Sequence, residues 1–204
     1  MIRALSAAML LAAVSVSAAP PALPSFEAAA GQIQNTVAAL RAASAKASST
    51  GIGARLDSMA WDLQNAQQDV SRQRSDLRFL MSRVNGAQPG QPDQNLRWEL
   101  QRLNQDLASL ARDAGWRLDE LRSLSAQAQK DPTLVGPATR LTDAARWLKS
   151  ETNWLTFDAR FASIGLLRAG LTFESMDLDR NGRDLDDNAA QLQTGADALL
   201  AKVR

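Results

Sequence analysis

Apolar side chains recur in alternating steps of three and four residues along most of this 204-residue chain. This spacing places them on one face of an α-helix and keeps that face turned toward a neighbouring helix. No stretch shows the strict alternation of apolar and polar residues that is typical of β-strands. The pattern predicts an all-α protein, an elongated antiparallel bundle of five helices with coiled-coil-like packing.

Clusters of turn-forming residues divide the periodic segments. They lie at residues 48–53, 85–93 and 131–137 and at the pair Asn181-Gly182. The first and last predicted helices are about half as long as the other three, and successive helices joined by short turns run antiparallel. We therefore expect a bundle of four columns whose fourth column is split between the first and last helices. The alternative is a three-helix coil with two loosely docked arms.

The fourth predicted helix extends from the break at 131–137 to Met176. Its apolar seam includes Ala169, Phe173 and Met176 at the C-terminal end. The fifth predicted helix begins after Asn181-Gly182, with Asp184 as its N-cap.

The N-terminal residues are typical of a secretory signal peptide. Arg3 precedes an apolar run over 4–14, and small residues at 16–18 suit cleavage after Ala18. The run is shorter than the ~20 residues that span a bilayer, which disfavours the alternative of an uncleaved membrane anchor. The sequence thus predicts a signal peptide at 1–18, a Pro-rich leader at 19–24 and one helical-bundle domain at 25–204. It also predicts a periplasmic or secreted protein.

Missing residue types restrict the chemistry of the chain. It has no cysteine and no histidine, so disulfides, thiolate sites and histidine-based catalysis are excluded. Lys and Arg number 23 and Asp and Glu 22, and removal of Arg3 with the signal peptide leaves the two equal. A neutral chain with scattered arginines is a poor ligand for nucleic acid. We expect a protein without enzymatic activity or cofactor.

Aromatic residues of the fourth predicted helix lie off its apolar seam. Trp147, Trp154 and Phe161 are seven residues apart and share one face, with Phe157 beside them. One interpretation is that these rings widen the core, since a helix with several neighbours needs a broad apolar face. The other is an exposed patch of these four residues that binds a protein partner, a second copy or an apolar ligand.

The segment from Asp177 to Asn188 resembles the first half of a calcium-binding EF-hand loop. Asp177, Asp179 and Asn181 offer oxygen ligands at alternate positions, and Gly182 follows at the place of the sharp turn. The second half departs from the pattern, because Asn188 stands where a bidentate Glu is required. The two interpretations are a weak calcium site and a plain helix end at Asn181-Gly182.

Polar residues also mark the second predicted helix. The arginines at its C-terminal end predict either a patch for an anionic partner or a solvated face paired with Asp69 and Asp76. Polar residues that interrupt the seams, such as Gln73 and Thr152, are expected to set the register of the bundle or to line a polar spot in the core. The clustered arginines are Arg72, Arg74, Arg78 and Arg83.

Together these features favour an interaction, scaffold or accessory protein of the cell envelope. It would bind a protein partner, or another copy of itself, through the aromatic face of the fourth helix. The alternative is a carrier or chaperone-like protein for lipids or other apolar ligands, which would need a hollow between its helices.

Overall fold

A computed structural model describes residues 26–86 and 94–204, with side chains from Gln34 onward except at 45, 85 and 86. The predicted signal peptide and Pro-rich leader lie outside the described residues. The chain divides into two compact units, Met1–Ala42 and Ala43–Arg204. The described part of the first unit is helical, and the second unit is the bundle to which the following paragraphs refer.

The described residues form four α-helices and one short 3-10 helix, and no strand occurs in these two ranges. The elements are α1 Phe26–Gly86, α2 Gln94–Gln127, η1 Pro132–Leu134, α3 Val135–Arg168 and α4 Thr172–Val203. The predicted all-α bundle is therefore confirmed. The break predicted at 85–93 falls between the end of α1 and the start of α2, and the break predicted at 131–137 falls at η1 and the start of α3.

The break predicted at residues 48–53 is wrong, because α1 runs through it. The Thr50 hydroxyl donates a hydrogen bond to the carbonyl O of Lys46, one turn earlier, at 2.9 Å. Threonine is often found at helix ends, but this bond is compatible with a helix interior. Ile52 and Leu56 are buried beyond this point. Gly51 and Gly53 of this segment together cost about 2 kcal/mol relative to Ala. Burial of Ile52 and Leu56 exceeds that cost, because each contributes about 1.5–3 kcal/mol.

The end of α3 was also predicted wrongly. The chain turns at Gly170, whose φ of 78° favours glycine, and not at Asn181-Gly182. The Leu171 N–H donates to the Leu166 carbonyl at 2.9 Å and the Gly170 N–H to that of Leu167 at 3.1 Å, as in a Schellman motif. The fully buried Leu171 then anchors the start of α4.

This turn changes the expected architecture. The bundle has four columns, but each is filled by one helix, with α4 alone occupying the last column from Thr172 to Val203. The predicted division of one column between the first and last helices is wrong. Phe173 and Met176, which were expected in the seam, are exposed on α4.

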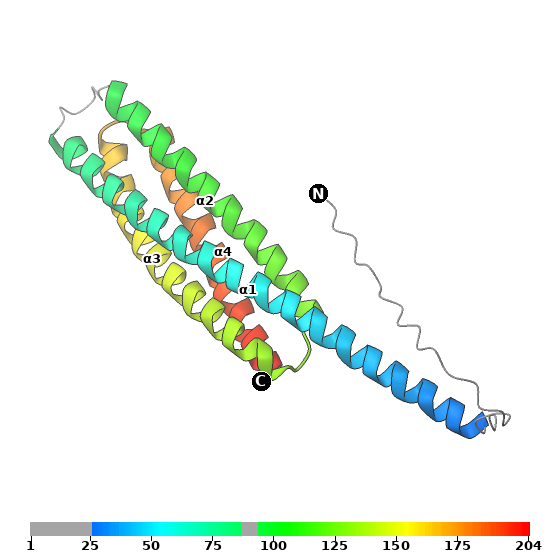
Figure 1. Cartoon of the computed structure of the whole chain (residues 1–204). Helices are drawn as coiled ribbons and strands as arrows, with labels where there is room; N and C mark the ends of the chain where they lie inside the picture. The colour runs from blue at the N-terminus through cyan, green and yellow to red at the C-terminus, as the bar shows by residue number, and fades with distance from the viewer. Residues whose placement is uncertain (1–25, 87–93) are drawn as a thin grey trace, which may run out of the picture. The chain divides into compact units, whose positions relative to one another are not determined.

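Figure 1 shows the helices side by side in the bundle, and side-chain contacts fix their order. Helix α2 runs antiparallel to α1, as Arg55 pairs with Glu120 and Arg83 with Glu99. Hydrogen bonds between α1 and α3 show that these two helices are parallel neighbours. Helix α4 contacts α3, to which it is antiparallel. It also contacts α2, to which it is parallel. The order is therefore α1, α2, α4, α3, so the η1 connection joins helices that are not neighbours.

Small residues of α3 and α4 allow the two helices to approach closely. Thr156 donates its hydroxyl to the Gly182 carbonyl at 3.1 Å, and Ser175 donates to the Ser163 carbonyl at 3.1 Å. Such bonds bring backbone and side chain together across the interface. Buried leucines spaced by seven residues complete the core, with Leu171 just before α4 and the others within it, namely Leu178, Leu185, Leu192 and Leu199.

Side-chain amides of α4 hold it against the backbone of α2. Asn181 Nδ2 donates to the Asn104 carbonyl at 3.0 Å, and Asn188 Nδ2 donates to the Ala111 carbonyl at 2.9 Å. Both donors and both acceptors are seven residues apart, so one axial register satisfies both bonds. The Asn-Gly pair that indicated a turn in the sequence is therefore part of a helix interface.

Within residues 26–86 and 94–204, none of the helices has the length and apolar character needed to span a membrane.

Candidate functional site

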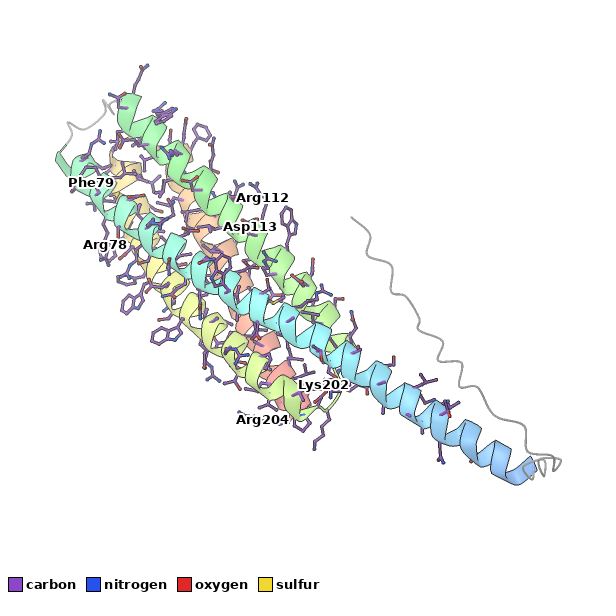
Figure 2. The ribbon with its side chains drawn as sticks, in the orientation of Figure 1. Arg78, Phe79, Arg112, Asp113, Lys202 and Arg204 are labelled. Carbon is purple, nitrogen blue, oxygen red and sulfur yellow. The ribbon has the colours of Figure 1, made fainter. Side chains whose placement is uncertain are left out.

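All five tryptophans point outward from the bundle. Their exposed fractions lie between 51% for Trp154 and 71% for Trp116, so the rings do not widen the core. Phe157 and Phe161 are 55% and 70% exposed. Ring side chains extend away from α3 in Figure 2. The four residues predicted as a patch are therefore all accessible on one helix.

Three of the four rings are in contact. Trp154 and Phe157 meet edge to face at 84°, with ring centroids 6.5 Å apart, and Phe157 and Phe161 lie 5.7 Å apart at 43°. Ile164 continues the same face and is 53% exposed. We call the surface formed by Trp147, Trp154, Phe157, Phe161 and Ile164 the aromatic strip.

Charged residues from α1 hold one edge of the aromatic strip. The Arg74 guanidinium lies 5.4 Å from the centroid of the Trp154 ring, within the range of a cation–π contact. Asp158 accepts hydrogen bonds from Arg74 Nε at 2.7 Å and from Arg78 Nε at 2.8 Å. This arrangement fixes the α1 side of the strip without covering its rings.

The electrostatics of this edge centre on Asp158. Partial burial by itself raises the pKa of its carboxyl, but the hydrogen bonds and positive charges of Arg74 and Arg78 outweigh this, so the pKa lies below the usual value for Asp. Asp158 is therefore an anion at neutral pH, and the edge is a compact ion-pair network with Glu151 as its second carboxylate.

The four clustered arginines are thus paired. Arg72 contacts Asp69 as the solvated-face interpretation expects, while Arg83 pairs with Glu99. Arg74 and Arg78 pair with α3 instead of with the predicted Asp76. Arg74 and Arg78 thus link α1 to α3. Their partners on α3 could not be predicted from residues nearby in the sequence.

The polar residues that interrupt the apolar seams also link helices. Gln73 Nε2 donates to Asp106 at 3.4 Å, and the buried Thr152 hydroxyl lies 2.9 Å from Asp186, which also accepts from Lys149. These contacts agree with the register-setting interpretation.

The segment interpreted as either a calcium-binding loop or a turn forms neither a loop nor a turn, because it lies within continuous α4. Asp177 and Asp179 lie on continuous α4 and pair with Arg180 and Arg183 on the same helix. Asn181 is turned into the α2 interface. In the described ranges, no three acidic side chains converge as a metal site would require.

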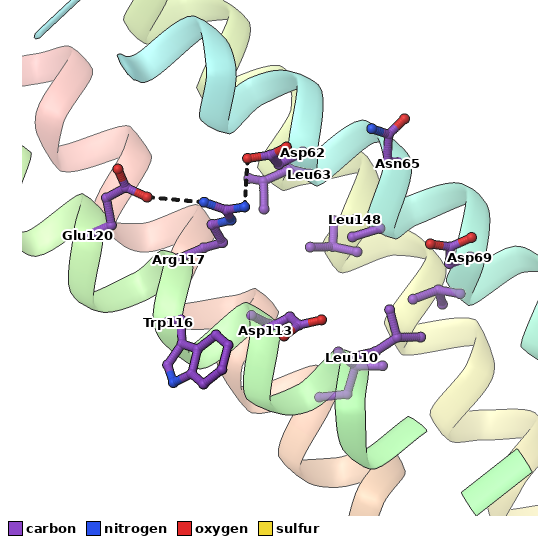
Figure 3. Close-up of a pocket in the computed structure, with 14 residues that line it drawn as sticks. Asp62, Leu63, Asn65, Asp69, Leu110, Asp113, Trp116, Arg117, Glu120 and Leu148 are labelled. Atoms are coloured by element: carbon purple, nitrogen blue, oxygen red, sulfur yellow. Dashed lines mark hydrogen bonds and ion pairs between the residues drawn. The ribbon is translucent and has the colours of Figure 1, made fainter. Parts of the chain in front are cut away.

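A separate slot opens between α1 and α2 (Figure 3). It has a volume of about 390 Å³, and Leu63, Leu110, Leu148 and Leu185 are among its apolar lining residues. Arg117 closes one end by pairing with Asp62 at 2.8 Å and Glu120 at 3.2 Å. The slot reaches Leu148 of α3 and Leu185 of α4, as the hollow of a carrier would reach the core.

Sequence reasoning located the rings but missed two features of the site. It did not find the Arg74 contact with Trp154, because the two residues are brought together only by the parallel packing of α1 and α3. It also missed Asp143 and Arg168, which lie at the two ends of the strip on α3. Their signal is present in the sequence, because both continue the three-four spacing of the aromatic residues.

Comparison with protein-family models, with curated proteins and with solved structures finds no match to this chain.

Proposed function

We propose that this chain is an exported, non-catalytic interaction protein of the cell envelope, and that the aromatic strip is its docking surface for a helix of a protein partner. The observation that carries this proposal is the contrast on α3. Its inner residues are fully buried, while four aromatic residues along its outer side, three of them in contact, are 51–70% exposed. Contiguous exposed aromatic residues of this size are typical of protein interfaces.

The shape of the strip supports a helical partner. Its residues follow the spacing of a coiled-coil seam from Trp147 to Ile164, about 25 Å at 1.5 Å per residue. Export is supported by the signal-peptide pattern of residues 1–18. The proposal includes no catalytic role, because the chain lacks histidine and cysteine.

The proposal is tested by site-specific photo-crosslinking in the cells that express the protein. A crosslinker replaces Phe157 in one variant and Trp61, an equally exposed ring on α1, in the control. We expect a crosslinked species of defined mass from position 157 and none from position 61. The proposal fails if position 157 gives no discrete product, or if both positions give the same one.

The slot between α1 and α2 favours a second candidate, a carrier of apolar ligands. Its volume of about 390 Å³ lies within the usual range for small-molecule sites. A carrier would copurify with a lipid, and Ala66→Trp, which fills the slot, would abolish this without affecting crosslinking at 157. Extraction of the purified protein with organic solvent and mass spectrometry of the extract tests this function.

A further inference from the structure

The outer side of α3 is a second coiled-coil seam, complete from end to end. Positions spaced by four and three residues lie along it, and each of them is exposed. Aromatic and aliphatic residues fill the middle, and a carboxylate and a guanidinium stand at the two ends. The seam comprises Asp143, Trp147, Ser150, Trp154, Phe157, Phe161, Ile164 and Arg168.

We propose that the occupant of the aromatic strip is a second copy of this chain, whose α3 lies antiparallel to the first in one defined register. This inference rests on the proposed function and names the partner. The two-fold axis passes between Trp154 and Phe157, so Trp154 packs against Phe157 of the second copy. One helical turn away, Ser150 faces Phe161 of the second copy, which places a small residue against a large one.

Charge complementarity selects this register. Asp143 and Arg168 are exposed, and within the described ranges neither has an ion-pair partner. The antiparallel pairing places Asp143 opposite Arg168 of the second copy, and symmetry produces this pair twice. A shift of one heptad in either direction would remove both ion pairs and leave part of the strip uncovered.

A groove in the bundle accommodates the outermost ring. Trp147 of the second copy lies opposite Ile164, beside an open groove of about 650 Å³ between α1 and α3. Leu77 and Met81 are among its apolar lining residues, and Gly165 adds no side chain to its wall. An indole inserted there would contact apolar atoms of both helices, as a knob does in a hole.

The apolar area of the strip is sufficient for a dimer. An aromatic side chain presents about 150–250 Å² when fully accessible, and these four are 51–70% exposed. The rings of two copies therefore offer about 1,000 Å², to which Ile164 and the surrounding side chains add. Specific interfaces begin at about this total size, so we expect a dissociation constant in the micromolar range.

Sedimentation equilibrium of the purified chain between about 1 and 100 μM tests the pairing. We expect a reversible dimer whose dissociation constant rises at least about 100-fold in Trp154→Ala/Phe161→Ala, because buried aromatic anchors dominate such interfaces. The control is Trp61→Ala/Trp98→Ala, which removes two equally exposed rings from α1 and α2 and should leave the dissociation constant unchanged. A wild-type chain that is monomeric at 100 μM, or a dimer insensitive to the strip variant, overturns the inference.

Charge reversal tests the register. Asp143→Arg and Arg168→Asp should each weaken the dimer about 10-fold, because each places like charges opposite one another at both ends. A mixture of the two single variants should form heterodimers with wild-type affinity, as should the double variant with itself. Arg112→Asp, at an exposed position labelled on α2 in Figure 2, is the matched control and should have no effect.

The outcomes separate this inference from the proposed function. Weakening without recovery on mixing overturns the antiparallel register. A monomeric wild-type chain that crosslinks from position 157 to a different protein overturns self-pairing and leaves the proposed function standing. If position 157 gives no discrete crosslinked product, both the proposed function and the self-pairing inference fail.

Discussion

Helix α3 carries two seams with the same periodicity and opposite environments. The inner seam, which includes Leu148 and Leu155, is buried against the other helices, while the outer seam through Trp154 and Phe161 faces solvent. Small residues such as Ala159 allow α4 to pack closely on the inner side. The two seams show that three-four spacing identifies a helix face that can pack against another helix. The sizes of the side chains on that face determine how closely the neighbouring helix can approach.

The largest expected effect separates the two seams by stability. Leu155→Ala should lower the free energy of unfolding by about 2–5 kcal/mol, because it leaves a cavity in a filled core. Phe161→Ala, only six positions further along α3, should change it by about 0.5 kcal/mol or less, as at other surface sites. Urea denaturation followed by circular dichroism measures both values, at protein concentrations low enough to exclude association. Equal losses in the two variants would contradict the division of α3 into an inner and an outer seam.

A smaller effect concerns the ion pairs between the seams. Asp158→Asn should destabilise the bundle by about 1–2 kcal/mol at pH 7, since it weakens charged hydrogen bonds with Arg74 and Arg78. The folded-state pKa of Asp158 is lowered, so its contribution is complete above the unfolded value of about 3.9 and is lost as the pH falls through the folded value. The difference between wild type and variant should therefore shrink below about pH 4.

The measurement is the free energy of unfolding from urea titrations at several pH values between 7 and 3. Asp119→Asn is the control, because its pair with Arg122 is exposed and should contribute little at any pH. A difference for Asp158→Asn that stays constant down to pH 3 would show that the charge of this carboxylate does not stabilise the fold.

The same contrast explains how far the sequence could be interpreted. Leucines at three-four spacing in α3 and α4 lie in the core as predicted, whereas Leu40 of the first predicted helix has the same spacing and is exposed. The aromatic residues were predicted to share a face, and they do. Whether that face was exposed depended on which helices adjoin α3, and this is set by the order α1, α2, α4, α3.

The end of α3 could not be predicted from local sequence signals alone. Asn181-Gly182 is a strong local turn signal, yet both residues are used in helix contacts. Gly170 followed by Leu171 carried the correct signal of a helix end with an apolar anchor. Local propensities of this kind amount to about 1 kcal/mol, so tertiary contacts decide which of two signals is used.

The smallest expected effect compares two glycines on α4, one facing α3 and the other facing α2. A Cβ at Gly182 would lie 3.7 Å from the Ala159 Cβ, an ordinary contact, whereas a Cβ at Gly195 would lie 3.0 Å from Leu121 Cδ2. Gly182→Ala should therefore stabilise the protein by about 0.5–1 kcal/mol through helix propensity. In Gly195→Ala the same gain is offset, because Leu121 is buried and has to shift. Thermal unfolding of the two variants in parallel should give a higher midpoint for Gly182→Ala than for Gly195→Ala. The reverse order would mean that α3 and α4 are closer together at Gly182 than α2 and α4 are at Gly195.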